Sequence, residues 1–125
     1  IKINPQSDKA FCALGILKTN ANDLKEAKQY FCRALDANLD NLLALKSLIE
    51  ISYKTEDFDR AQNYLKHFLE VYPANINMLF AMAGIQFKRG EIEDSLQTLD
   101  TVLVLDPKHQ YALDFQNSVR TVSVE

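Results

Sequence analysis

The residue types that most often do chemistry in proteins are sparse in this chain. His67 and His109 lie 42 positions apart (109 − 67), and neither is part of a metal-ligand motif. Cys12 and Cys32 are too few for a disulfide framework, so we expect two free thiols in a reducing, cytoplasmic compartment. The sequence contains no glycine-rich phosphate loop, nucleophile elbow or HExxH motif.

Acidic residues could bind a cation, but their placement favours a structural role. Glu91, Glu93 and Asp94 begin a predicted helix, where the positive end of the helix dipole favours carboxylates. Asp57 and Asp59 lie in a predicted turn without the spacing of a calcium loop. The sequence therefore predicts no catalytic residue, metal site or cofactor, and a chain that is not itself an enzyme.

Composition narrows the possible partners. The chain has 14 Lys and Arg against 17 Asp and Glu, a net charge of −3, and no basic stripe of the kind that binds nucleic acid. Its apolar runs are far shorter than the roughly 20 residues that span a bilayer. We expect neither nucleic-acid binding nor membrane insertion.

The elements that position these residues follow an internal repeat of 34 residues (61 − 27 and 95 − 61). Small, large and closing residues all keep this step: Ala27, Ala61 and Ser95; Phe31, Leu65 and Leu99; Leu17, Ile51 and Ile85; Pro73 and Pro107. Within each period the apolar spacing is helical and is broken at TNAND, KTEDF and KRGEI. The pattern predicts helices at 8–20, 24–37, 42–54, 58–71, 76–89 and 92–105, and a final amphipathic helix.

These units resemble the tetratricopeptide repeat, whose pattern is an aromatic, Leu-Gly, Tyr, Ala, an aromatic and a closing Pro. The first unit matches at Phe11, Leu14, Gly15, Ala27 and Phe31, although no unit has Trp in the first slot. The resemblance implies an all-α, right-handed superhelical solenoid of antiparallel helix pairs, with about seven helices. It implies one domain with repeats at 8–41, 42–75 and 76–109, and a capping helix at 110–125.

By the same resemblance, the first helix of each unit lines a concave groove that binds a peptide or a partner helix. The groove positions are Lys9, Cys12, Ile16, Leu43, Lys46, Glu50, Tyr53, Asn77, Phe80, Phe87 and Tyr111. Phe87 has two interpretations. It lies either in the groove or, if the register slips by one residue, in the core between helices.

Two ligand classes known for the family do not fit these residues. Chaperone-binding members hold a C-terminal carboxylate with Lys, Asn and Arg, but the matching positions here are Cys12, Ile16, Ser47, Asn77 and Ala81. Sugar-transferase arrays carry an asparagine ladder, whose matching positions here are Ala13, Ser47 and Ala81, and its absence counts against this one subtype only. We therefore expect a protein-interaction scaffold, and alternatively a non-catalytic recruiting arm of a larger enzyme such as a glycosyltransferase.

The first residues, IKINP, are in phase with the ends of the later helix pairs, since Pro5 lies 102 positions before Pro107. We interpret residues 1–7 as the remnant of a preceding repeat in a longer array. Ala10, Leu14 and Leu17 would then lack their covering helices. We expect that strip to be covered by a second copy of the chain or by Ile1 and Ile3.

Overall fold

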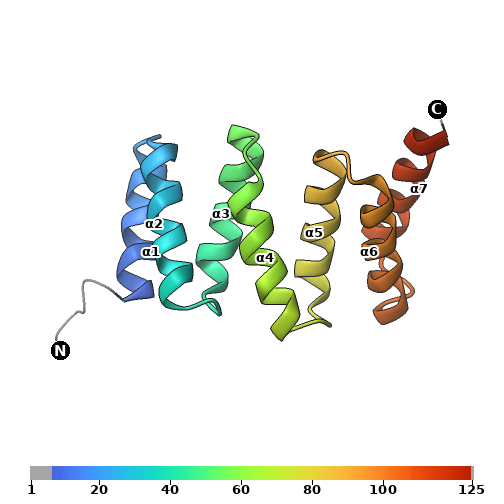
Figure 1. The fold of residues 1–125 in the computed structure, drawn as a ribbon, viewed down its shortest axis with the longest axis horizontal. Helices are drawn as coiled ribbons and strands as arrows, with labels where there is room; N and C mark the ends of the chain where they lie inside the picture. The colour runs from blue at the N-terminus through green and yellow to red at the C-terminus, as the bar shows by residue number, and fades with distance from the viewer. Residues whose placement is uncertain (1–6, 125) are drawn as a thin grey trace. The chain divides into compact units, whose positions relative to one another are not determined.

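The computed structural model describes residues 7–124, and every regular element in this range is an α-helix. The helices are α1 (Asp8–Asn20), α2 (Leu24–Ala37), α3 (Leu42–Thr55), α4 (Asp59–Val71), α5 (Ile76–Lys88), α6 (Ile92–Leu105) and α7 (Gln110–Val124) (Figure 1). The first six agree with the predicted ranges to within one residue at each end. The interpretation of IKINP, and the expected role of Ile1 and Ile3, lie outside the described residues.

Capping residues recur with the 34-residue step and start the first helix of each pair. The side chains of Ser7, Asn41 and Asn75 each accept a hydrogen bond from the backbone N–H three residues later. In the fourth copy His109 does the same, because its Nδ1 accepts from the N–H of Ala112 at 3.0 Å. Four different helices therefore begin with the same hydrogen bond, made by three different residue types.

The turn inside each helix pair also repeats. Asn22, Glu56 and Gly90, each 34 positions after the previous one, have φ angles of +60°, +56° and +79°. This left-handed conformation costs an L-residue about 1–2 kcal/mol, less for Asn and nothing for Gly. Glu56 is therefore the most strained of the three turn residues.

We predict that Glu56→Gly raises the free energy of unfolding by about 1 kcal/mol, because glycine adopts this φ without the clash of a Cβ atom. Gly90→Ala is the matched control. No atom lies within 4 Å of the Cβ that this substitution would add, so only the unfavourable φ angle destabilises the variant. Its free energy of unfolding should fall by a similar amount. Urea denaturation of both variants measures the effect. A loss of stability in Glu56→Gly would contradict the account of this turn.

Contacts divide the chain into two compact units, one up to Phe68 and one from Leu69 onwards, with the boundary inside α4. In the first unit, α2 packs against both α1 and α3. Gly15 allows the closest approach: a Cβ built there would lie 2.7 Å from the ring of Phe31, which is buried. The absence of a side chain at Gly15 therefore leaves the space that the ring of Phe31 occupies.

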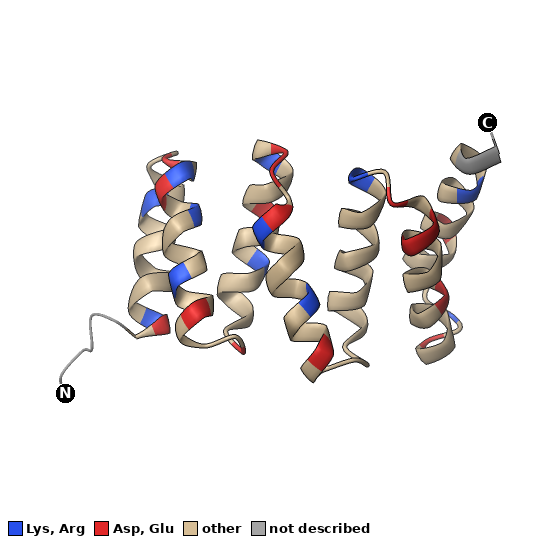
Figure 2. Cartoon of the chain, in the orientation of Figure 1, with Lys and Arg blue, Asp and Glu red and all other residues tan. Residues whose placement is uncertain are grey.

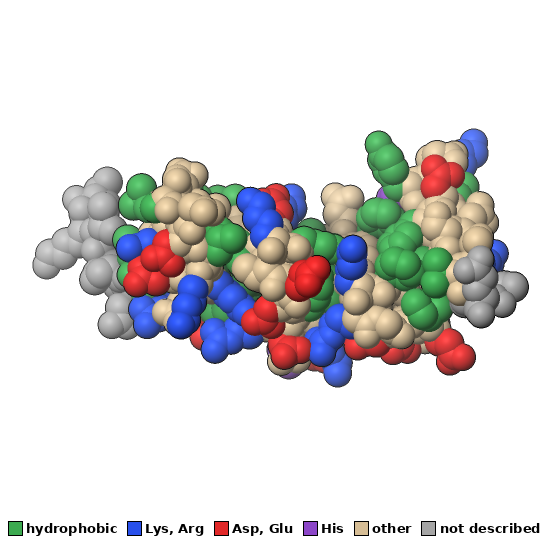
Figure 3. Space-filling view, turned by 90° about the horizontal axis from the view of Figure 1, so that it is seen from above, with side chains coloured by type: hydrophobic (Ala, Val, Ile, Leu, Met, Phe, Trp, Pro, Cys, Tyr) green, Lys and Arg blue, Asp and Glu red, His purple; other side chains and the backbone are tan. Residues whose placement is uncertain are grey.

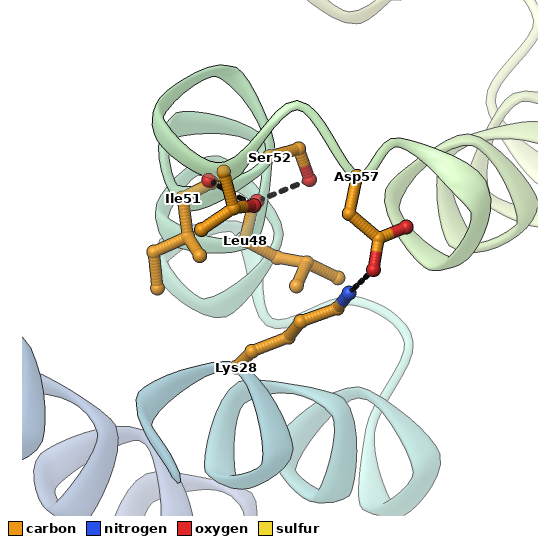
Figure 4. A network of polar contacts seen from close by, with 6 residues as sticks. Lys28, Leu48, Ile51, Ser52 and Asp57 are labelled. Carbon is orange, nitrogen blue, oxygen red and sulfur yellow. Dashed lines mark hydrogen bonds and ion pairs between the residues drawn. The ribbon is translucent and has the colours of Figure 1, made fainter. Parts of the chain in front are cut away.

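Polar contacts join helices of the first unit (Figure 4). Lys28 on α2 forms an ion pair with Asp57, which precedes α4, and this hydrogen bond lowers the pKa of the Asp57 carboxyl. The buried hydroxyl of Ser52 donates to the carbonyl of Leu48 at 2.8 Å. A polar residue in the slot where the family places Tyr is thus satisfied within its own helix.

The second unit has its own core. Its buried members are Leu79, Ala83, Leu99, Val102, Ala112 and Val119, contributed by α5, α6 and α7. The small residue at the crossing of α5 and α6 is Ser95, whose hydroxyl donates to the carbonyl of Ala83 at 2.8 Å. In this repeat the crossing is therefore both closely packed and hydrogen-bonded.

Candidate functional site

Four predicted groove residues of the first unit lie around one open pocket of about 490 Å³. Lys9, Cys12 and Ile16 come from α1 and Leu43 from α3. The remaining lining residues are Asp8, Ala13, Asn38, Asp40 and Asn41. The pocket joins one face of α1 to the start of α3, where the sequence predicted a groove.

The floor of this pocket is apolar. Ile16 and Leu43 leave 39% and 56% of their surface exposed, and the small Ala13 is exposed beside them. Cys12 is buried, with only 4% of its surface exposed, and burial is the main cause of the raised pKa of its thiol. The negative charge of Asp8 raises it further, so the thiol is neutral and acts as a small apolar group.

The rim of the pocket is polar, and sequence reasoning missed most of it. Two amides donate to Oδ2 of Asp8, Nδ2 of Asn41 at 2.8 Å and Nδ2 of Asn38 at 3.3 Å. The hydrogen bond from Asn41 is the main cause of the lowered pKa of the Asp8 carboxyl. The pairing of Asp8 with Asn41 spans 33 positions (41 − 8), so no local pattern could have indicated it.

Three further predicted residues lie farther along α3 and do not line this pocket. Lys46 and Glu50 are exposed. Tyr53 is 40% exposed, and its ring contacts the edge of Phe58 with the ring centroids 5.2 Å apart. Tyr53 is therefore partly exposed to a partner and partly packed against Phe58.

In the second unit, the predicted aromatic residues form a chain of ring contacts. The ring of Phe80 lies 5.3 Å from His109 and 5.9 Å from Phe115, and Phe87 lies 5.5 Å from Phe115. Phe80 and Phe87 are partly buried against the core of this unit. Of the two interpretations of Phe87, these contacts favour packing between α5 and α7.

Tyr111 and Asn77 differ from the two phenylalanines. Tyr111 is 76% exposed, and its ring centroid lies 6.4 Å from that of His109. Asn77 is exposed on α5. Seen from above, hydrophobic side chains also gather over the region of α5 to α7 (Figure 3).

The outer face of α1 is the second candidate for a contact. Leu17 is 63% exposed and Leu14 is 37% exposed. The residues one and two repeats later than Leu17, Ile51 and Ile85, are 2% and 0% exposed. The apolar strip of Leu14 and Leu17, with the half-buried Ala10, is thus open in the first repeat, whereas Leu17's equivalents in the next two are buried.

The described residues form neither a metal-binding cluster nor a membrane-spanning helix. Within 7–124, no three His, Cys, Asp or Glu side chains come together as metal ligands would. No helix in the described part of the chain has both the length and the hydropathy to cross a bilayer. Cys12 and Cys32 are free thiols. Acidic and basic residues are interspersed along the helices of the first unit (Figure 2).

The repeat spacing, the helix pairs and their crossings define a helical-repeat protein. A tetratricopeptide-repeat family model matches residues 52–117, just over half of the chain, and a second one matches residues 8–41. The chain belongs to the tetratricopeptide repeat family.

Two curated relatives are much longer than this chain. Anaphase-promoting complex subunit 3 of Dictyostelium discoideum is 26% identical over 110 residues, which are 87% of this chain and 11% of that protein. The Sol locus transcriptional repressor of Clostridium acetobutylicum is 32% identical over 66 residues, which are 53% of this chain and 21% of that protein. The chain thus spans a small part of each relative.

Solved structures share the fold at low sequence identity. The first TPR of Spaghetti (RPAP3), bound to the HSP90 peptide SRMEEVD, has a TM-score of 0.77 at 14% identity over 100% of this chain and 99% of that one. YrrB, a TPR protein with an unusual peptide-binding site, has a TM-score of 0.75 at 22% identity over 93% and 60%. An O-GlcNAc transferase of Thermobaculum terrenum has a TM-score of 0.65 at 18% identity over 90% and 22%. These likenesses confirm the all-α solenoid fold class.

Proposed function

We propose that this chain is a non-catalytic interaction module that binds a peptide or a partner helix on the first helices of its repeats. The observation that carries the proposal is the pocket of about 490 Å³ on α1 and α3, lined by Lys9, Cys12, Ile16 and Leu43. An apolar floor with a few fixed polar groups is the usual composition of a protein's ligand site. Two of the similar structures are described as peptide complexes or peptide binders, which supports this class of function.

The ligand differs in class from the chaperone peptide of the Spaghetti complex. That peptide ends in Glu-Glu-Val-Asp. The pocket presents two carboxylates, Asp8 and Asp40, and one cation, Lys9. A C-terminal carboxylate would meet like charge there, so we propose that this chain does not bind such peptides.

Selection from a random peptide library, followed by calorimetry, tests the proposal. Leu43→Glu places a charge on the apolar floor and should weaken binding about tenfold or more. Val104→Glu on α6 is the matched control. Val104 is also an exposed aliphatic residue (79%), but it lies on the second helix of its repeat, outside the proposed site. Equal effects of the two substitutions, or no peptide retained by the unchanged chain, would contradict the proposal.

A second candidate is the recruiting arm of a larger enzyme. The fold likeness to the Thermobaculum terrenum transferase, of which this chain covers 22%, is the observation that favours it. At the positions of the asparagine ladder this chain has Ala13, Ser47 and Ala81, which counts only against the ladder-bearing subtype of recruiting arm. Assay of the full-length protein for sugar transfer distinguishes the two candidates.

We further propose that the strip of Ala10, Leu14 and Leu17 associates with a second copy of the chain. Exposed aliphatic residues in a contiguous strip favour contact over hydration. We predict that Leu17→Ser shifts the mass measured by sedimentation equilibrium toward the monomer, while Val104→Ser leaves it unchanged. A monomeric parent chain would contradict the proposal.

A further inference from the structure

The pocket on α1 and α3 has a composition that selects among peptides. We propose, building on the peptide-binding function above, that it takes an aliphatic side chain of a partner segment in which Lys or Arg flanks that residue. The volume of about 490 Å³ lies within the roughly 300–1,000 Å³ of typical ligand sites.

The floor sets the preference for an aliphatic residue. Cys12, Ala13, Ile16 and Leu43 present thiol, methyl and branched alkyl groups, and none of the described lining residues is aromatic. The thiol of Cys12 is neutral because burial and the nearby Asp8 raise its pKa. A polar anchor would lose its hydration here without gaining a hydrogen bond from the floor.

The rim sets the preference for flanking cations. The side-chain amides of Asn38 and Asn41 both donate to Oδ2 of Asp8. Those same contacts keep the carboxylate ionised and fixed in orientation. Asn38 also accepts from the backbone N–H of Asp40 at 3.0 Å, which ties the backbone of the second acidic residue to the rim. A guanidinium or ammonium group can therefore pair with Asp8 and with Asp40.

The helix ends at this rim do not reverse that preference. The N-termini of α1 and α3 would attract an anion if their N–H groups were free. Instead, Ser7 accepts from the N–H of Ala10 at 3.1 Å, and Asn41 accepts from the N–H of Ala44 at 2.9 Å. These bonds occupy one N–H group at each helix end, and Lys9 offsets only one of the two carboxylates, Asp8 and Asp40, that line the pocket.

Three capped 12-residue peptides in one Gly-Ser frame test the proposal, with the central triplets Arg-Leu-Arg, Glu-Leu-Glu and Arg-Ser-Arg. By fluorescence anisotropy on the whole chain, the first should bind more tightly than each of the others by about tenfold. The double variant Asp8→Asn, Asp40→Asn should reduce the preference for Arg over Glu roughly fivefold. Glu93→Gln with Asp94→Asn, which removes two charges from α6, should leave it unchanged.

Two single variants sharpen the test. Lys9→Glu removes the offsetting cation and should strengthen binding of the Arg-Leu-Arg peptide. Ala13→Leu fills the pocket from an exposed position and should abolish that binding while the chain stays folded. The bound peptide should also slow alkylation of Cys12 by N-ethylmaleimide but not of Cys32, which is equally buried at 4% exposure and lies on α2.

The outcomes separate this inference from the function on which it rests. Preference for Glu-Leu-Glu, or binding that is indifferent to Ala13→Leu, would overturn the pocket's proposed specificity. If peptides selected from a random library still bind in that case, the interaction function stands and only the specificity is wrong. If no selected peptide binds either, both fail.

Discussion

Ala61→Glu is expected to abolish the cooperative unfolding transition of the first unit. Ala61 lies in α4 with none of its surface exposed, and its equivalents Ala27 and Ser95 are also fully buried. A glutamate there needs space that the packed interior lacks, and its charge would have no water and no partner. The combined cost, about 4–5 kcal/mol or more, approaches the 5–15 kcal/mol that stabilises a typical domain.

Circular dichroism during heating measures this effect. Asn63→Glu is the matched control, because it places the same side chain two residues later on the exposed side of α4. The free energy of unfolding of that variant should lie within about 0.5 kcal/mol of the parent chain's. A cooperative transition retained in Ala61→Glu would show that the repeat register is wrong.

Phe80→Ala is expected to lower the free energy of unfolding by about 2 kcal/mol, roughly half the cost of removing a fully buried phenylalanine. Its ring packs against His109 and Phe115 and against the core of the second unit. The sequence instead placed Phe80 among the groove positions, where its loss would leave stability nearly unchanged. Tyr111→Ala is the control, since Tyr111 is 76% exposed and should be close to neutral.

Peptide affinity and chemical denaturation, measured on the same two variants, distinguish the two roles of Phe80. The structure predicts a large change in denaturation midpoint for Phe80→Ala. A tenfold loss of peptide affinity with an unchanged midpoint would restore Phe80 to the binding surface.

The repeat spacing was sufficient to predict the helices. Buried residues such as Leu65 and Leu99 recur every 34 positions, and a helix must place them on one face. The N-caps of the first helix of each pair were missed because Ser, Asn and His make the same hydrogen bond. Their 34-residue spacing therefore appears in the hydrogen bonds and not in the residue types. Likewise the left-handed turn was indicated by Gly90 but not by Glu56.

The candidate site was only partly predictable. Family positions identified Lys9, Cys12, Ile16 and Leu43, which the structure brings to one pocket. They did not identify Asp8, whose hydrogen bond from Asn41 links α1 to the residue that caps α3. Nor could they assign Phe80 and Phe87, because one-residue differences in helix rotation decide whether a ring faces a groove or the next helix.

The central claim is that partners bind on the first helices, at the pocket of α1 and α3. The most direct test is a ¹⁵N–¹H spectrum of the chain titrated with a library-selected peptide. The account predicts that the largest shifts occur at Lys9, Cys12, Ile16 and Leu43, with little change at Tyr64 and Asp36, which hydrogen-bond to each other between α4 and α2. Shifts concentrated at Tyr64 and Asp36, with the pocket unchanged, would contradict it.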